Sequence, residues 1–172
     1  KWIPLCRYNP GLILINDNGT PTYSTDDEVV YRTTWYDQNG KQVMPKEIHS
    51  LAQDMDGTLW VGTNEGLFFF FFTTDFFTSD NCERVIIPRN DGTNLADYLL
   101  ENEQINAIVV DGANRKWIGT TTSGVFLLSE DGKETIEHFT AENSPLMSNS
   151  ILSIAIHEST GEVFIGTTDG LM

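Results

Sequence analysis

Three histidines are the residues of this sequence best suited to acid–base or metal chemistry, but their positions favour a structural role. His49, His138 and His157 fall in three separate apolar segments. A nucleophile relay needs a serine or cysteine, a base and an orienting acid together, and a zinc site needs closely spaced ligands. Neither arrangement is visible here, so we expect half-buried histidines on strands, of which His49 could line a central channel.

The carboxylates form no complete catalytic or metal-binding motif either. The segment Asp54-Met55-Asp56-Gly57 resembles the start of a calcium loop, but the glutamate at the last position of such a loop is missing. Asp26 and Asp27 could serve acid–base catalysis only across a cleft, and Glu28 beside them indicates a solvated cluster. The sequence has no glycine-rich phosphate loop and no Cys-x-x-Cys pair. We therefore expect a non-enzymatic protein without catalytic residues, cofactor or metal.

The chain is strongly acidic. Its 25 Asp and Glu against 10 Lys and Arg give a net charge of −15 and a pI near 4.3. Phosphate backbones are bound by clustered cations, so nucleic acid is excluded as an expected partner. The acidity is explained by solubility, with a surface that binds or steers cations as the alternative.

The apolar runs and the cysteines predict neither a membrane span nor a disulfide. The longest apolar run begins at Leu67 and is far shorter than the ~20 residues that span a bilayer, so this segment predicts no membrane insertion. Cys6 and Cys82 do not make a disulfide framework. We expect them in loops on opposite faces of the fold, and therefore unbonded.

An internal repeat is the main signal of the sequence. Three segments, beginning at Ile48, Ile105 and Ile151, share an alternating apolar stretch, a turn, an aromatic–aliphatic pair, Gly-Thr, a polar turn and a glycine before another apolar stretch. The Gly-Thr pairs are Gly62-Thr63, Gly119-Thr120 and Gly166-Thr167. A degenerate fourth copy opens the chain at Lys1.

The repeat predicts strands rather than helices. The apolar runs are short, rich in β-branched and aromatic residues, and separated by turn dipeptides such as Asp56-Gly57 and Asp131-Gly132. Each unit then has four strands, and such a sheet buries both faces only by stacking on a copy of itself. We expect Trp60, Trp117 and Phe164 to pack between neighbouring units. The glycine of each Gly-Thr pair should allow close backbone approach or positive φ.

The expected architecture is an all-β propeller of four-stranded antiparallel blades. Counting strands gives about 14, or roughly 3.5 blades, whereas propellers usually close with four to eight. The chain is thus expected to be a partial propeller, with a small four-bladed ring as the alternative. The blade boundaries are expected near 1–47, 48–104, 105–150 and 151–172.

Asn94–Gln104 shows helical spacing with Asn94 as N-cap, so we expect one or two helical turns there. The run Phe68–Phe72 is unusual, because the third strand of such a blade usually carries a single aromatic residue.

The segment Asp54–Leu67 resembles the two-component regulator propeller repeat almost letter for letter. That family implies two contexts: the periplasmic sensor region of hybrid histidine kinases, mostly in gut Bacteroidota, and the PorZ type of propeller in the type IX secretion apparatus at the cell surface. The PorZ type is the more similar, through the stretches Pro88–Tyr98, Asn106–Ile108, Asp111–Trp117, Ser144–Leu146 and Thr160–Thr167.

The resemblance implies a secreted, periplasmic or cell-surface interaction module. Its partner would be a protein or an anionic glycan such as lipopolysaccharide. The periplasmic ligand-sensing propeller of a hybrid kinase is the second possibility. The third is a glycan lyase or glycosidase, which would require carboxylates converging on the channel.

A binding face can be expected where the longest loops emerge together. The insertion Arg89–Gln104 and the widened loop Leu5–Pro10 lie on one face of such a propeller. Cationic and aromatic groups there would suit an anionic glycan or a protein hot spot. The candidate residues are Arg7, Tyr8, Arg89, Asn90, Asp91 and Tyr98. Alternatively, the insertion merely covers the junction between two blades.

Overall fold

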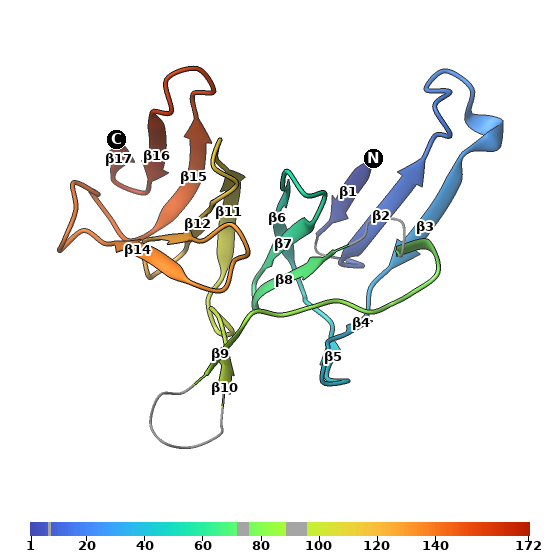
Figure 1. Ribbon diagram of the computed structural model, residues 1–172, viewed down its shortest axis with the longest axis horizontal. Helices are drawn as coiled ribbons and strands as arrows, with labels where there is room; N and C mark the ends of the chain where they lie inside the picture. Colours follow the sequence, from blue (N-terminus) through green and yellow to red (C-terminus); the bar gives the residue numbers. More distant parts are fainter. Residues whose placement is uncertain (7, 72–75, 89–95) are drawn as a thin grey trace.

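The computed structural model describes residues 1–6, 8–71, 76–88 and 96–172. Within them the chain is all-β, with a short 3-10 turn, η1 (Ser24–Asp26), between the second and third strands. Four antiparallel sheets of three or four strands follow one another along the chain, with two short two-stranded sheets between them. Figure 1 shows them side by side in chain order, from the first sheet in blue to the fourth in red.

The first and second sheets each contain three named strands. The first sheet has the order β1 (Trp2–Leu5), β2 (Gly11–Asn16) and β3 (Glu28–Arg32). The second sheet has the order β6 (Ile48–Gln53), β7 (Leu59–Thr63) and β8 (Gly66–Phe70). The linker between these sheets contains a short hairpin of β4 (Trp35–Tyr36) and β5 (Gln42–Val43).

The third sheet is the complete unit. It consists of β11 (Ile105–Val110), β12 (Lys116–Thr120), β13 (Val125–Leu128) and β14 (Thr135–Phe139). The fourth sheet has β15 (Ile151–Ile156), β16 (Val163–Thr167) and β17 (Gly170–Leu171). These strands lie where the repeat predicts them, and in every sheet they pair in chain order.

Two expectations about the second unit are wrong. In the described residues its fourth strand is reduced to a single antiparallel bridge between Phe69 and Glu83. The expected helix is also not formed, because Ala96–Tyr98 is strand β10 and pairs with β9 (Ile86–Pro88). The expected N-cap, Asn94, lies outside the described residues. Figure 1 shows this β9–β10 hairpin projecting from the row of sheets.

The apolar core lies at the junctions between sheets. The described residues form three separate clusters of buried side chains, one for each junction. Strand β11 packs against β6 and β7 on one side and against β15 on the other. Figure 1 places the first and fourth sheets at opposite ends of the row, so the four sheets do not close on one another. The second and third sheets thus bury both faces against neighbours, as propeller blades do, and the first and fourth sheets bury one face each.

The phenylalanine run of β8 is explained by this arrangement. Because side chains alternate along a strand, Phe68 and Phe70 join the cluster with the first sheet, which also contains Trp35. Leu67 and Phe69 join the cluster with the third sheet. β8 is buried at all five positions. The run therefore supplies apolar side chains to two junctions from one strand.

Two of the Gly-Thr glycines, Gly62 and Gly119, pack closely against the first isoleucine of the next sheet. A Cβ atom on Gly62 would lie 2.6 Å from Cγ2 of Ile105, and one on Gly119 would lie 2.5 Å from Cγ2 of Ile151. Neither glycine has positive φ. Of the two reasons expected for this glycine, close approach is therefore the one that applies at both positions.

The aromatic residues that precede Gly-Thr are on the second strand of each unit, as predicted. Trp60 is 2% exposed and belongs to the cluster shared with the third sheet. Trp117 is half-buried and stacks on Phe139, with ring centroids 5.7 Å apart. Phe164 departs from the expectation because it is 43% exposed.

Candidate functional site

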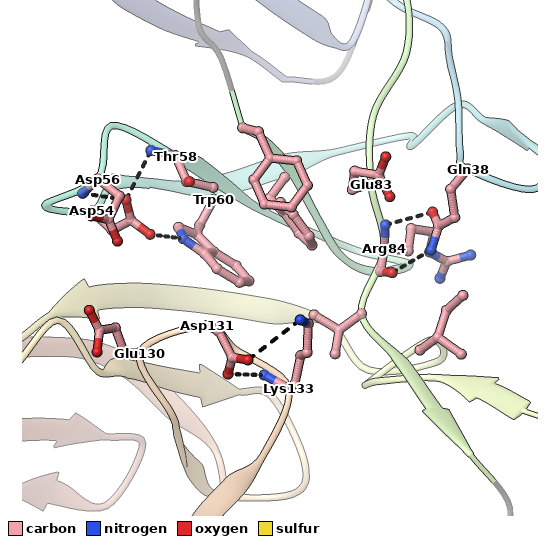
Figure 2. A pocket seen from close by; sticks show the side chains of 14 residues that line it. Gln38, Asp54, Asp56, Thr58, Trp60, Glu83, Arg84, Glu130, Asp131 and Lys133 are labelled. Atoms are coloured by element: carbon pink, nitrogen blue, oxygen red, sulfur yellow. Dashed lines mark hydrogen bonds and ion pairs between the residues drawn. The ribbon is translucent and has the colours of Figure 1, made fainter.

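The site is built at the junction between the second and third sheets, where both neighbouring units are present. A cleft of about 400 Å³ opens there (Figure 2). One wall comes from β7 and β8, a second from the segment Glu83–Ile86, and the third from the turn between β13 and β14. The cleft is wide because the fourth strand of the second unit is reduced to one bridge beside β8.

A buried ion pair closes the junction behind the cleft. Lys116 is 0% exposed, and its Nζ lies 3.0 Å from Oδ2 of Asp54 on the neighbouring unit. The same ammonium donates to the carbonyl oxygens of Asn114 and Glu130. It also lies 5.1 Å from the ring centroid of Trp60. All three acceptors and the aromatic face compensate for the loss of hydration of this charge.

Asp54 organises the turn that follows β6. Its Oδ1 accepts the backbone N–H groups of Asp56 and Thr58, and its Oδ2 accepts the indole N–H of Trp60 at 2.8 Å. Burial opposes ionisation, but the bonds from Trp60 and Lys116 outweigh it and hold the pKa of Asp54 below its ordinary value. The calcium-loop motif is thus a turn whose first carboxylate binds internal donors.

Aromatic rings line the inner wall of the cleft. Trp60 stacks on Phe69 with ring centroids 4.6 Å apart. Phe71 meets Phe69 edge to face at 5.0 Å and is 53% exposed. Gly132 lies so close to the indole of Trp60 that a Cβ there would stand 3.0 Å from Cζ3. The turn of the third sheet is therefore held against the aromatic wall.

Carboxylates dominate the rim of the cleft. Figure 2 shows Glu83 and Glu130 on two of its sides, neither with a dashed contact to the residues drawn. Burial, followed by the negative charge of Asp37, raises the pKa of Glu83. Asp131 lies 3.6 Å from Lys133, whose side chain is 73% exposed. The arrangement suits a cationic group with an apolar stem.

The expected binding face is described only in part. Tyr8 is 97% exposed in the turn between β1 and β2, and Tyr98 is half-buried on β10. Among the described contacts none joins these two tyrosines. Arg7, Arg89, Asn90 and Asp91 lie outside the described residues, so the face they would form stays a prediction.

Tyr98 anchors the β9–β10 hairpin to the linker between the first two sheets. The guanidinium carbon of Arg84 lies 4.0 Å and Nζ of Lys41 5.2 Å from its ring centroid. Its hydroxyl accepts a hydrogen bond from Asn39 Nδ2 at 3.0 Å. Glu101 binds both cations, and the hydrogen bond from Lys41 is the main cause of its lowered pKa.

The histidines lie apart, as predicted, but the expected half-burial on a strand holds for His49 alone, because His138 and His157 are exposed. His49 is on β6, with Nε2 3.3 Å from Oε2 of Glu47. His138 is exposed on β14 and stacks on Phe126, and His157 follows β15. In the part of the chain that the structure describes, no group of three His, Cys, Asp or Glu side chains could hold a metal ion.

The cysteines are free and differ in their surroundings. Burial, then the negative charge of Asp37, raises the pKa of Cys82 to about 12, whereas Cys6 is exposed. Iodoacetamide at pH 8 is expected to alkylate Cys6 in the native protein and to leave Cys82 unmodified, because the thiolate is the nucleophile. Mass spectrometry of tryptic peptides would measure this. In denaturant both should react, and rapid native labelling of Cys82 would contradict the described burial.

The residues of this cleft were not singled out from the sequence, because the place of Glu83 in the repeat is visible only once the strand pairing is known. Phe69 is the third residue after Gly66 and Leu127 the third after Gly124, and they pair with Glu83 and Glu137. Glu83 therefore occupies the fourth-strand position of its unit. Because Glu83 forms a single bridge and not a ladder of pairs, the fourth strand of the second unit is interrupted there.

Comparisons with known proteins agree with the architecture. Residues 43–65 match the family described as two component regulator propeller. The solved structure of PorZ, described as an essential bacterial surface component of the type-IX secretion system of Porphyromonas gingivalis, is similar, with a TM-score of 0.84 and 34% identity. That match covers 95% of this chain and 22% of PorZ. A search of curated proteins finds no match.

Two further structures show the fold alone. They are the extracellular domains described as hybrid two-component systems BT4673 and BT3049 of B. thetaiotaomicron, with TM-scores of 0.63 and 0.56 and identities of 16% and 20%. They match 99% of this chain, which spans 23% and 24% of their lengths. None of the helical segments in the described ranges has the length and apolar character of a membrane span. Residues 43–65 therefore carry the two-component regulator propeller repeat, and the sheets stacked in chain order agree with the fold of these similar structures.

Proposed function

We propose that the chain is part of a non-enzymatic, extracytoplasmic β-propeller interaction module of the PorZ type, acting in type IX protein secretion. The observation that carries this proposal is the 34% identity to PorZ over 95% of the chain, against 16% to 20% for the sensor domains. Periplasmic or cell-surface localisation belongs to the same proposal, because the similar structures are described as surface or extracellular.

The propeller itself is proposed to be longer than the four units of this chain. The units run near 1–47, 48–104, 105–150 and 151–172. The exposed ring of Phe164 and the 22% coverage of PorZ support further blades. A binding partner is proposed to be a protein, with an anionic glycan such as lipopolysaccharide as the alternative ligand of the face around Tyr8 and Tyr98.

The second candidate function is ligand sensing in a hybrid two-component system. The repeat match at residues 43–65 and the shared fold of the BT4673 and BT3049 domains favour it. A sensor would transmit ligand binding to a kinase, whereas a secretion component would act on other exported proteins. The two functions therefore predict different phenotypes.

Deletion of the gene in the bacterium that encodes the chain separates these functions. For a secretion component, proteins normally released or displayed at the surface should accumulate inside the cell, and the complementing gene should restore them. Proteomics of medium, surface and cell fractions would measure the change. Normal export together with a lost transcriptional response to an external ligand would overturn the proposal and favour the sensor.

A further inference from the structure

The cleft between the second and third sheets combines apolar walls with an acidic rim. Phe71, at 53% exposed, and Ile86, at 38% exposed, leave apolar surface open within it. Glu83 and Glu130 lie on the rim, and Figure 2 draws neither in a contact with the other lining residues. The two cations that line the cleft are already engaged: Arg84 with Glu101 and Lys133 with Asp131.

The same junction shows what chemistry suits these surroundings. Lys116 places an ammonium against the ring of Trp60 and the carboxylate of Asp54, while its stem is buried between the sheets. The cleft repeats the same elements nearer to solvent: aromatic rings for an alkyl stem and carboxylates for a cation. It has room for an added group, because about 400 Å³ is open.

We infer that this cleft binds a lysine or arginine side chain of a partner polypeptide, with the stem against Phe71 and Ile86 and the cationic end between Glu83 and Glu130. The charge of the chain, −15, favours such a partner and steers it toward the surface. An anionic glycan would be repelled here, so any glycan site belongs to another face. The inference deepens the proposed interaction role and rests on it for its biological meaning.

Burial adds to the expected strength of the contact. The Glu83 carboxyl group is held partly out of water near Asp37, and its raised pKa indicates that negative charge is incompletely compensated there. A cation arriving at Glu83 relieves this cost and gains attraction that solvent screens less than at an open surface. Added salt should therefore weaken the binding of the cation, but by less than it weakens an exposed ion pair.

A defined peptide tests the inference on the whole protein. The probe is the acetylated, amidated peptide Gly-Gly-Lys-Gly-Gly, and the matched probe has norleucine in place of lysine. Binding is followed by NMR through the ring resonances of Phe71 and the indole N–H of Trp60. The lysine peptide should shift these resonances, and norleucine should bind about threefold to tenfold more weakly, as one partly buried ion pair predicts.

The chain offers a matched control variant. Glu83→Gln should raise the Kd of the lysine peptide about threefold to tenfold, whereas Glu137→Gln should change it less than about twofold. Glu137 occupies the equivalent strand position in the third sheet, is exposed, and is not among the residues that line the cleft. Both variants remove one carboxylate, so a general charge effect would be equal in the two.

Three results would overturn the inference. They are equal binding of the norleucine peptide, equal effects of the two substitutions, and shifts of the Phe71 resonances by the polyanion heparin in place of the lysine peptide. Unchanged unfolding midpoints by circular dichroism would show that both variants fold. Because this assay does not involve export, its failure leaves the secretion proposal standing, and normal export after gene deletion leaves the cleft assay unaffected.

Discussion

Replacement of Asp54 by alanine is expected to lower the free energy of unfolding by about 3–5 kcal/mol, the range found when one partner of a buried ion pair is removed. The substitution leaves the ammonium of Lys116, 0% exposed, without the carboxylate 3.0 Å away. It also removes the acceptor of the Trp60 indole N–H and of two backbone N–H groups in the turn. Denaturant unfolding followed by far-ultraviolet circular dichroism would measure the loss.

Asp131→Ala is the control for this prediction. Asp131 also accepts hydrogen bonds within a turn, but its side chain is 57% exposed and its cation, Lys133, is 73% exposed. Its replacement should cost about 1 kcal/mol or less. Equal losses in the two variants would contradict a special role for Asp54.

Because the native pKa of Asp54 is lowered, the stabilisation from its charge is present above pH 3.8, the ordinary value, and is lost as the pH falls through the native pKa.

The second large effect is expected at Gly119. Gly119→Ala should destabilise the protein by about 2–3 kcal/mol, the upper part of the range for overpacking a core. The added Cβ would lie 2.5 Å from Cγ2 and 3.1 Å from Cβ of Ile151, which is 0% exposed. The fourth sheet would have to move away from the third. The midpoint and slope of denaturant unfolding would report the change.

Gly112→Ala provides the matched control in the same sheet region. No heavy atom lies within 4 Å of a Cβ built on Gly112, and its φ is not positive. The change in stability there should be within about 0.5 kcal/mol. If Gly119→Ala were equally harmless, the close packing of the third and fourth sheets would be wrong.

Much of the fold could be predicted because the packing between sheets requires particular residue types at particular positions of the repeat. A glycine is required where Ile105 and Ile151 enter the preceding sheet, and an aromatic residue is required beside it. These needs occur at both of these junctions, so they give this part of the sequence a period. The strands of the third unit lie in the apolar runs of the same pattern.

The expected helix failed because tertiary contacts outweigh local preference. The spacing of Leu95, Tyr98 and Leu99 is compatible with a helix, but the ring of Tyr98 packs under Arg84 and near Lys41. The backbone N–H of Leu99 donates to the carbonyl of Val85 at 2.9 Å. These partners lie on other segments of the chain, and a local pattern does not contain them.

The cleft could not be predicted for a related reason. Lys116 occupies the repeat position held by Lys1, Leu59 and Val163, so the pattern does not predict whether this residue is apolar or charged. Its partner Asp54 belongs to the preceding unit, and Glu83 looks in the sequence like any surface acid. Only the interrupted fourth strand of the second unit leaves the space in which these side chains gather.

A double-mutant cycle between Asp54 and Lys116 tests the stacking of propeller units most directly. The two residues belong to different units and interact only if the second and third sheets pack side by side. Denaturant unfolding of Asp54→Asn, Lys116→Met and the double variant should give a coupling energy of at least about 1 kcal/mol, since residues in one ion-pair network are not additive. Additive losses, within about 0.3 kcal/mol, would contradict the account.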